Sequence, residues 1–252
     1  MKIMHQNSKN CLDSIMDYIK HETFESKMSI VSQLKPKHSD EEFLQLVKDL
    51  HDYMGAGFHT ITAQTSIITY LLYKNPQEIP KLRAEIKKVI NNDLANLNKD
   101  TLEQFTYLVY FMKECQRMEN SSSGTLNYRV FEDLEIDGVT LKKGTDILYN
   151  IHGLHHHKDQ WIEPEKFIPE RFDPESKYFK TPSGLNRNQM SFMPFSVGPR
   201  NCPGGFISNL QIRVFIIVMA MKINWTIDEK GFASSEPSFG TMSKSELIAV
   251  VR

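Results

Sequence analysis

Cysteine is scarce in this chain. The 252 residues include three cysteines, Cys11, Cys115 and Cys202, an odd number spread far apart in the sequence. A disulfide framework in a secreted domain normally uses an even set of cysteines in an oxidising compartment. The cysteine content therefore argues against a disulfide-rich scaffold and favours a reducing compartment.

The chain also lacks a strong net charge and a long apolar run. Thirty basic and 31 acidic residues leave a formal net charge of -1, which gives no indication of a nucleic-acid partner. The longest notable apolar run, residues 214–221, is far shorter than the roughly 20 residues of a membrane span. The N-terminus has no apolar centre of the kind found in signal peptides. The chain as given therefore reads as cytoplasmic.

The first half of the chain has a helical pattern. Residues 1–35 are charged and helical in pattern. Ser39 opens a capping box that predicts a helix over residues 39–75, long for a globular domain. Apolar residues lie on nearly every face of its second half, which is therefore predicted to run through the core. A further helix is predicted from Pro76, and Thr101 is predicted to cap the next one, which ends near residue 118.

The pattern changes after residue 128. Residues 128–149 form short alternating runs with turns at Asp137-Gly138 and Lys143-Gly144, which predict small strands. Residues 152–201 are rich in His, Pro and Gly and predict an irregular segment, followed by one last helix and a strand-like tail. The predicted fold class is therefore mainly α with a small β-sheet.

Cys202 lies in a segment, residues 194–205, that reads PFSVGPRNCPGG. A thiol near neutral pH is mostly protonated, and positive potential favours the thiolate that binds metals. Arg200 supplies a charge, and the predicted helix just after Cys202 supplies a positive dipole end, with Pro203 suited to its first position. Phe195 is predicted to shield the sulfur from water.

The glycines of this segment leave space for a large flat group beside the sulfur, since they carry no side chain. They are Gly198, Gly204 and Gly205. A single thiolate in such a loop suits the fifth ligand of a haem iron. The alternative from these residues alone is a buried structural cysteine beside a helix start.

The segment resembles the haem-binding signature of the cytochrome P-450 family, F-x-x-G-x-R-x-C-x-G, at every fixed position. Three further segments resemble family elements and occur in the family's order: ECQR at 114–117 resembles E-x-x-R, FIPERF at 167–172 resembles the P-E-R-F segment, and AGFHT at 56–60 resembles the oxygen-binding segment A-G-x-D/E-T. The resemblance runs from about residue 10 to the C-terminus.

The resemblance implies a partial cytochrome P-450 fold, with a long I helix, K and L helices and a Cys-ligand loop. Family members are about twice as long, so the chain corresponds to the C-terminal half of a single domain, with the N-terminal half absent. The expected division is helices preceding the I helix (1–38), the I helix (39–75), the J to K helices (76–118), small strands with the PERF segment and Cys-ligand loop (119–201), and the L helix with C-terminal strands (202–252).

The resemblance also implies the cofactor, haem b (iron protoporphyrin IX), and its ligand. Cys202 is the expected thiolate ligand of the iron, and Arg200 and Arg129 are the expected partners of the haem propionates. The full set of expected cofactor-binding residues is Phe195, Gly198, Arg200, Cys202, Gly204, Arg129, Ala56 and Gly57.

Thr60 and His59 are the expected catalytic residues. Thr60 matches the family's distal threonine, which usually holds a water and helps to deliver protons, and Gly57 is expected to let the helix distort locally. His59 stands where the family usually has Asp or Glu, and it either replaces the acid as a proton shuttle or weakens the relay. Glu114, Arg117 and Arg171 resemble the family's buried charge triad, which has a structural role.

Two other features concern the segments between these motifs. Residues 118–129 are serine-rich where the family usually has a proline-rich turn, so the path of the chain toward the haem edge is open. Three adjacent histidines, residues 155–157, are not predicted to share a metal, because adjacent side chains point in different directions. The family commonly has one or two histidines here, ahead of the tryptophan matched by Trp161.

The function implied by the resemblance is that of an oxidoreductase, a haem-thiolate monooxygenase. It inserts one atom of O2 into a small organic, apolar substrate with electrons from an NADPH-dependent reductase or a ferredoxin. The alternatives are a truncated remnant without catalysis and a haem-thiolate peroxide isomerase or dehydratase, which His59 permits. The expected location is the cytosolic face of the endoplasmic reticulum membrane if the full gene product has an N-terminal anchor, since this chain shows none.

Overall fold

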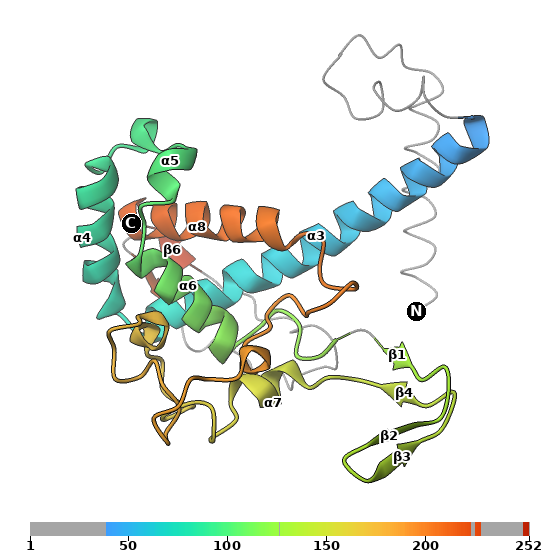
Figure 1. Ribbon diagram of the computed structural model, residues 1–252. Helices are drawn as coiled ribbons and strands as arrows, with labels where there is room; N and C mark the ends of the chain where they lie inside the picture. Colours follow the sequence, from blue (N-terminus) through green and yellow to red (C-terminus); the bar gives the residue numbers. More distant parts are fainter. Residues whose placement is uncertain (1–38, 126, 223–224, 228–248, 252) are drawn as a thin grey trace. The chain divides into compact units, whose positions relative to one another are not determined.

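The computed structural model describes residues 39–125, 127–222, 225–227 and 249–251 (Figure 1). The helices expected within residues 1–38 lie outside this part of the chain. The chain divides into two units, residues 1–59 and residues 60–252, and each is considered by itself.

Helix α3 (Asp40–Lys74) is 35 residues long. Its capping box is confirmed: Ser39 donates from its backbone N and from Oγ to Glu42 Oε2 at 2.9 Å each, and Glu42 N donates to Ser39 Oγ at 3.4 Å. The helix is α-helical through Gly57. The role expected for this glycine, to permit a local distortion, stays a prediction.

The core of the second unit joins four helices (Figure 1). They are the C-terminal half of α3, α4 (Glu78–Ile90), α6 (Tyr107–Met118) and α8 (Gly205–Lys222). Ile68, Leu82, Phe111 and Ile216 are fully buried in this cluster. Each such side chain stabilises the fold by about 1.5–3 kcal/mol relative to an exposed position. The prediction that the second half of α3 enters the core is confirmed.

The start of α6 differs from the prediction. Thr101 does not cap this helix, because its hydroxyl accepts from Asn98 N at 2.8 Å in the capping box of the short helix α5 (Lys99–Leu102). Glu85 of α4 binds the first turn of α6 instead, accepting from the backbone N of Thr106 (2.7 Å), Tyr107 (2.8 Å) and Leu108 (2.8 Å). A carboxylate at this end also complements the helix dipole. A 3-10 turn, η2 (Leu94–Asn96), connects α4 to α5.

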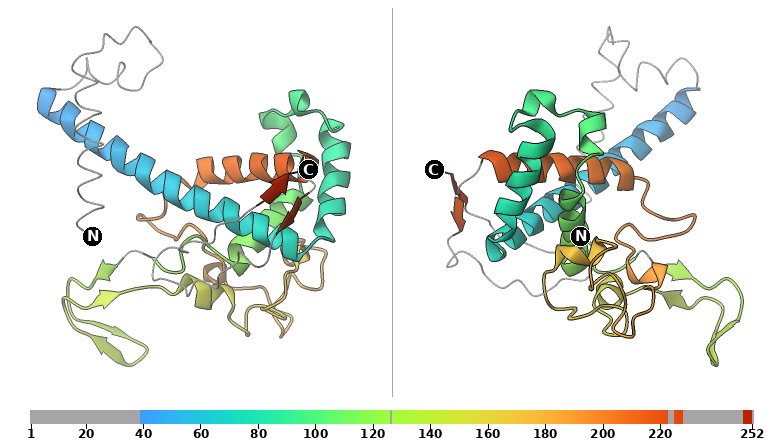
Figure 2. Two further views of the ribbon diagram at one scale, coloured as in Figure 1. Left: turned by 180° about the vertical axis from the view of Figure 1, so that it is seen from behind. Right: turned by 60° about the vertical axis from the view of Figure 1, so that its left-hand side comes forward.

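The described strands pair in two-stranded antiparallel sheets, and the predicted fold class, mainly α with a small β component, is confirmed (Figure 2). β1 (Tyr128–Arg129) pairs with β4 (Asp146–Ile147), β2 (Leu134–Ile136) with β3 (Val139–Leu141), and β5 (Trp225–Ile227) with β6 (Ala249–Val251). Asp137 and Gly138 have φ of 48° and 78°, as the predicted tight turn of the β2–β3 hairpin requires.

The segment between β4 and α8 is largely irregular, as predicted. Its regular elements are short: α7 (Ile151–His155), η3 (Pro169–Phe172) and η4 (Gln189–Ser191). Both α7 and η3 contact α6, and α7 also contacts η4. The irregular segment is therefore fixed against the helix that carries the E-x-x-R residues.

Helix α8 is long and apolar enough, by length and composition, to cross a membrane. The core helix of a water-soluble protein passes the same test. In this structure Ile212, Ile216 and Ile217 of α8 are buried in the helical core, and Arg83 Nε donates to the carbonyl of Ala220 at 2.7 Å. These contacts place the C-terminal half of α8 in the core of the second unit.

Candidate functional site

The segment 194–205, the cysteine loop, folds back on itself where it leads into α8. Cys202 N donates to the carbonyl of Phe195 at 2.9 Å, and Asn201 N donates to the carbonyl of Gly198 at 3.1 Å. Gly198 has φ of 78°, a left-handed conformation that glycine adopts without strain. Helix α8 begins at Gly205, three residues after the cysteine, so its positive end lies close to the cysteine along the chain.

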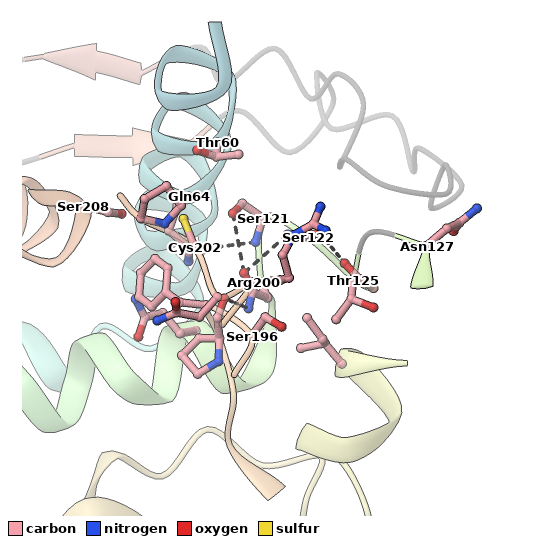
Figure 3. Close-up of a pocket in the computed structure, with 18 of the residues that line it drawn as sticks. Thr60, Gln64, Ser121, Ser122, Thr125, Asn127, Ser196, Arg200, Cys202 and Ser208 are labelled. Atoms are coloured by element: carbon pink, nitrogen blue, oxygen red, sulfur yellow. Dashed lines mark hydrogen bonds between the residues drawn. The ribbon is translucent and has the colours of Figure 1, made fainter. Parts of the chain in front are cut away.

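A pocket of about 730 Å³ lies beside this loop (Figure 3). It is lined by α3 and α6, the segment that follows α6, the cysteine loop and α8. The predicted site residues that line it are Thr60, Arg129, Phe195, Arg200 and Cys202.

The environment of the sulfur differs from the sequence prediction in one respect. Cys202 is exposed, and no part of the chain that the structure describes covers it. The ring of Phe195 lies against Gly205, where an added Cβ would meet Phe195 Cγ at 3.3 Å. Phe195 is thus committed to the start of α8, and the sulfur borders the pocket.

The residues around the pocket fit a large, flat, anionic group. Its volume is within the range of small-molecule and cofactor sites, about 300–1,000 Å³. Gly204 lies beside the sulfur, since an added Cβ there would be in ordinary contact with Cys202 Sγ at 3.7 Å. Arg200 is exposed at the pocket and has no ion-pair partner in the part of the chain that the structure describes. The donor set is a single cysteine sulfur with an exposed arginine on the same pocket, which fits a haem whose iron is held by cysteine.

Arg129 has a partner that the sequence did not predict. Its Nε and Nη2 donate to the two carboxylate oxygens of Asp146 at 2.8 and 3.1 Å, across the β1–β4 pair. These hydrogen bonds raise the pKa of Arg129 and lower that of Asp146. Both side chains are well exposed, so the pair is weakly held.

Of the other predicted residues, Gly198 and Gly204 shape the loop. Ala56, Gly57 and His59 lie on α3 within the first unit, residues 1–59, and are exposed. Thr60 is exposed at the pocket, and Gln64, one turn further along α3, is buried.

Sequence reasoning missed two polar residues that anchor the serine-rich segment. Gln64 donates from Nε2 to the carbonyl of Glu119 at 3.3 Å and accepts from Ser121 N at 3.0 Å. Asn120 donates from Nδ2 to the carbonyl of Pro194 in the cysteine loop at 3.0 Å. These side chains join α3, the segment after α6 and the cysteine loop.

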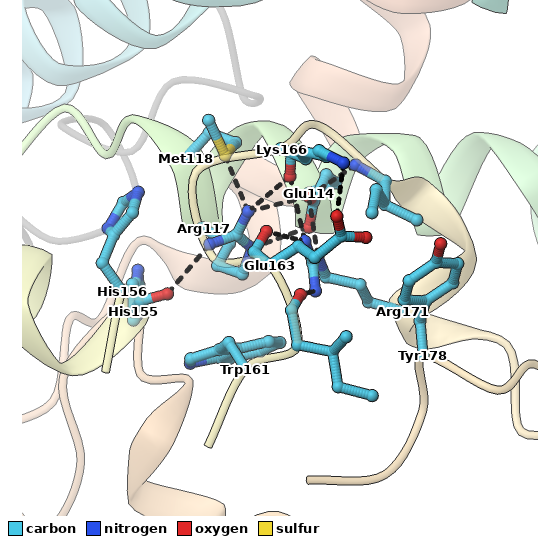
Figure 4. A network of polar contacts seen from close by, with 12 residues as sticks. Glu114, Arg117, Met118, His155, His156, Trp161, Glu163, Lys166, Arg171 and Tyr178 are labelled. Atoms are coloured by element: carbon cyan, nitrogen blue, oxygen red, sulfur yellow. Dashed lines mark hydrogen bonds and ion pairs between the residues drawn. The ribbon is translucent and has the colours of Figure 1, made fainter. Parts of the chain in front are cut away.

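The predicted charge triad forms a buried cluster (Figure 4). Glu114 accepts from Arg117 Nε at 2.8 Å, from Arg117 Nη2 at 2.9 Å and from Arg171 Nε at 3.2 Å. It also accepts from the backbone N of Ile168 at 2.8 Å. Burial lowers the pKa of Arg171, while the charge and hydrogen bond of Glu114 oppose that shift.

Backbone carbonyls complete the cluster. Arg117 donates to the carbonyls of His155 (3.0 Å) and Lys166 (3.1 Å), and Arg171 donates to those of Ile162, Glu163 and Lys166. A buried arginine is tolerated when its donors are satisfied. The cluster thereby ties η3 and the segment before it to α6.

His155 is buried beside this cluster. Its Nε2 accepts a hydrogen bond from the backbone N of Met193 at 3.0 Å. Burial lowers the pKa of His155 to about 4, helped by the charges of Arg117 and His156 and opposed by the backbone carbonyls of Gln116 and Arg117. The ring is therefore neutral at physiological pH.

The chain is similar to known proteins over most of its length. The family model of cytochrome P-450 matches residues 1–250. The chain is 31% identical over 189 residues to "Probable cytochrome P-450 6a14" of Drosophila melanogaster, covering 74% of this chain and 36% of that protein. It is 25% identical over 238 residues to "Steroid 17-alpha-hydroxylase/17,20 lyase" of Ovis aries, covering 91% of this chain and 45% of that protein.

A third relative is "Cytochrome P-450 3A9" of Rattus norvegicus, 31% identical over 189 residues, with 74% of this chain and 36% of that protein covered. The chain belongs to the cytochrome P-450 family. It spans less than half the length of these three relatives.

Removing the negative charge of the buried cluster is expected to destabilise the second unit strongly. In Glu114→Gln two buried arginines lose their common counter-ion, and breaking a buried pair in this way costs about 3–5 kcal/mol. The free energy of unfolding from denaturant titration measures the effect. Asp133→Asn is the matched control, because it breaks the exposed pair with Lys142 and is expected to change little. Equal stability of the two variants would contradict the assignment.

Acid is expected to destabilise the second unit through His155. The folded-state pKa is about 4 against an ordinary 6.5, so the unfolded chain takes up the proton first as the pH falls. The stability held by the neutral ring is complete above pH 6.5 and is lost between 6.5 and 4, by about 3 kcal/mol. Urea titrations at several pH values are expected to show a smaller pH slope in His155→Gln, whereas His157→Gln keeps the parent slope.

Proposed function

We propose that the protein of which this sequence is part acts as a haem-thiolate monooxygenase. Membership of the cytochrome P-450 family supports the class of enzyme. The single observation that carries the proposal for this chain is the exposure of Cys202 at a pocket of cofactor size, which Phe195 and Arg200 of the cysteine signature also line.

The residues that would hold the haem are those of the cysteine loop and its neighbours. The thiolate of Cys202 would bind the iron, Arg200 would pair with a propionate, and Gly198 and Gly204 would leave space for the porphyrin. Arg129 would join them only if a haem propionate replaced Asp146 as its partner. The Arg129–Asp146 pair is exposed, so breaking it costs little free energy. Bound haem b supplies the activation of O2 and the insertion of one oxygen atom into the substrate.

Thr60 and His59 are the proposed proton-handling residues. The hydroxyl of Thr60, which lines the pocket, would hold a water molecule and pass a proton. His59 would stand in for the family's acid, since an imidazole can accept and donate a proton near neutrality. Ala56 and Gly57 would border the haem on the same helix. We also propose that α3 serves as the I helix and that α6 and α8 serve as the K and L helices of one domain.

The proposed partners are those of the family. Electrons would come from an NADPH-dependent reductase or a ferredoxin, and the substrate would be a small organic, apolar molecule. If the full gene product has an N-terminal anchor, the proposed location is the cytosolic face of the endoplasmic reticulum membrane.

Replacing the thiolate is expected to abolish the spectral signature of the site. The chain is supplied with haem, reduced and exposed to CO, and the red-shifted Soret band of thiolate ligation is recorded. Cys202→Ala is expected to lose this band completely, because alanine has no sulfur that could bind the iron. Ser208→Ala, which changes another residue of the same pocket, is expected to keep it. Persistence of the band in Cys202→Ala would refute the proposed ligand.

A second candidate function is favoured by one residue. His59 replaces the acid that supports oxygen activation, and a haem-thiolate isomerase or dehydratase of peroxides does not need that acid. Turnover of a lipid hydroperoxide without a reductase would favour this function over the monooxygenase. Failure of the chain to take up haem at all would favour a non-catalytic remnant.

A further inference from the structure

His155 makes contacts in two directions from one buried position. Its backbone carbonyl accepts from Arg117 Nη1 of the charge cluster at 3.0 Å. Its ring accepts, at Nε2, from the backbone N of Met193 at 3.0 Å. The residue is completely buried, and Met193 is only 4% exposed. One residue thus connects the charge cluster to the start of the cysteine loop.

The direction of the second hydrogen bond determines the form of the ring. A backbone N–H can only donate, so Nε2 of His155 must carry the lone pair. The neutral ring then holds its proton on Nδ1, a buried atom with no hydrogen-bond partner among the described residues. A protonated ring has no acceptor and would lose this contact. The ring also packs against Phe192, with centroids 5.2 Å apart, which limits its rotation.

From Met193 the hydrogen bonds continue to the cysteine. The carbonyl of Met193 accepts from Ser196 N at 3.0 Å, and the carbonyl of Phe195 accepts from Cys202 N at 2.9 Å. A shift of Met193 would therefore move, through these two hydrogen bonds, the peptide group to which Cys202 N donates. Since a buried N–H without a partner is costly, the imidazole fixes the point where the loop leaves the core.

We propose that His155 is a positioning residue for Cys202, holding the cysteine loop in place through the hydrogen bond from the Met193 amide to its neutral imidazole. The role in ligation rests on the proposed haem-thiolate function. The role in holding the loop does not, because it concerns the chain alone.

The contact is separable from the charge cluster. Arg117 binds the backbone carbonyl of His155, so a change of the side chain leaves that hydrogen bond available. The ion pairs of Glu114 with Arg117 and Arg171 involve no atom of His155. Substitution at position 155 therefore tests the loop anchor without removing a charge of the cluster.

Two variants that differ by one methylene group test the proposal. In His155→Gln the longer amide places an oxygen near the position of Nε2, where it can accept from Met193 N. In His155→Asn the amide reaches only as far as Nδ1, so the Met193 amide loses its acceptor. His157→Asn is the control, because His157 is an exposed neighbour outside this path.

The first measurement is hydrogen exchange of the Met193 and Ser196 amides in the full chain, by NMR. Both are expected to exchange about tenfold faster in His155→Asn and at nearly the parent rate in His155→Gln and His157→Asn. Unchanged exchange in His155→Asn, or equally fast exchange in His155→Gln, would overturn the proposal, whether or not the chain binds haem.

The second measurement is the CO-reduced spectrum with haem supplied. The ratio of thiolate-ligated to thiolate-free haem is expected to fall about tenfold in His155→Asn and to be restored in His155→Gln. A parent-like spectrum in His155→Asn alongside faster exchange would overturn the positioning of Cys202. Absence of the thiolate band from the parent chain would instead count against the proposed function, and the exchange rates would still decide the loop anchor.

Discussion

One carboxylate, Glu114, compensates two buried arginines, and the irregular half of the second unit depends on it. Arg117 and Arg171, which lie 54 residues apart in the sequence, both donate to this carboxylate. Both also donate to backbone carbonyls. The segment between β4 and α8 has little regular structure to hold it, so its carbonyls find partners in the guanidinium groups. The cluster thus replaces the hydrogen-bond ladders that a sheet or helix would provide.

The cysteine motif and the long helix could be predicted from sequence because each depends on residues at short, fixed spacing. The charge triad joins residues more than 50 positions apart, and it could be predicted only from the resemblance to the family. The capping box at Ser39 is local, as is the turn at Asp137-Gly138. The prediction for the start of α6 was wrong because the carboxylate at its first turn, Glu85, comes from a different helix. The hydroxyl of Thr101 instead accepts from Asn98 N. No pattern within the segment contains that information.

The remaining differences also arise from tertiary contacts. The partner of Arg129 depends on the register of the β1–β4 pair, which brings Asp146 opposite it. The roles of Gln64, Asn120 and His155 depend on backbone atoms 38 to 74 residues away. Burial of the Gln64 amide and of the His155 imidazole is the signal that would have found these two, and burial is known only once the helices are packed. The serine-rich segment shows that side-chain amides can brace a path for which the family usually uses proline.

The carboxylate of Glu85 at the first turn of α6 has a consequence for the opposite end of that helix. A helix rises about 1.5 Å per residue. With its first turn bound to α4 and its last turn bound through Arg117 to α7, α6 cannot slide along its axis by one residue without breaking both sets of contacts. The distance between the helical core and the cysteine loop is thereby fixed. A change in the position of α4 would shift the C-terminal end of α6 as well.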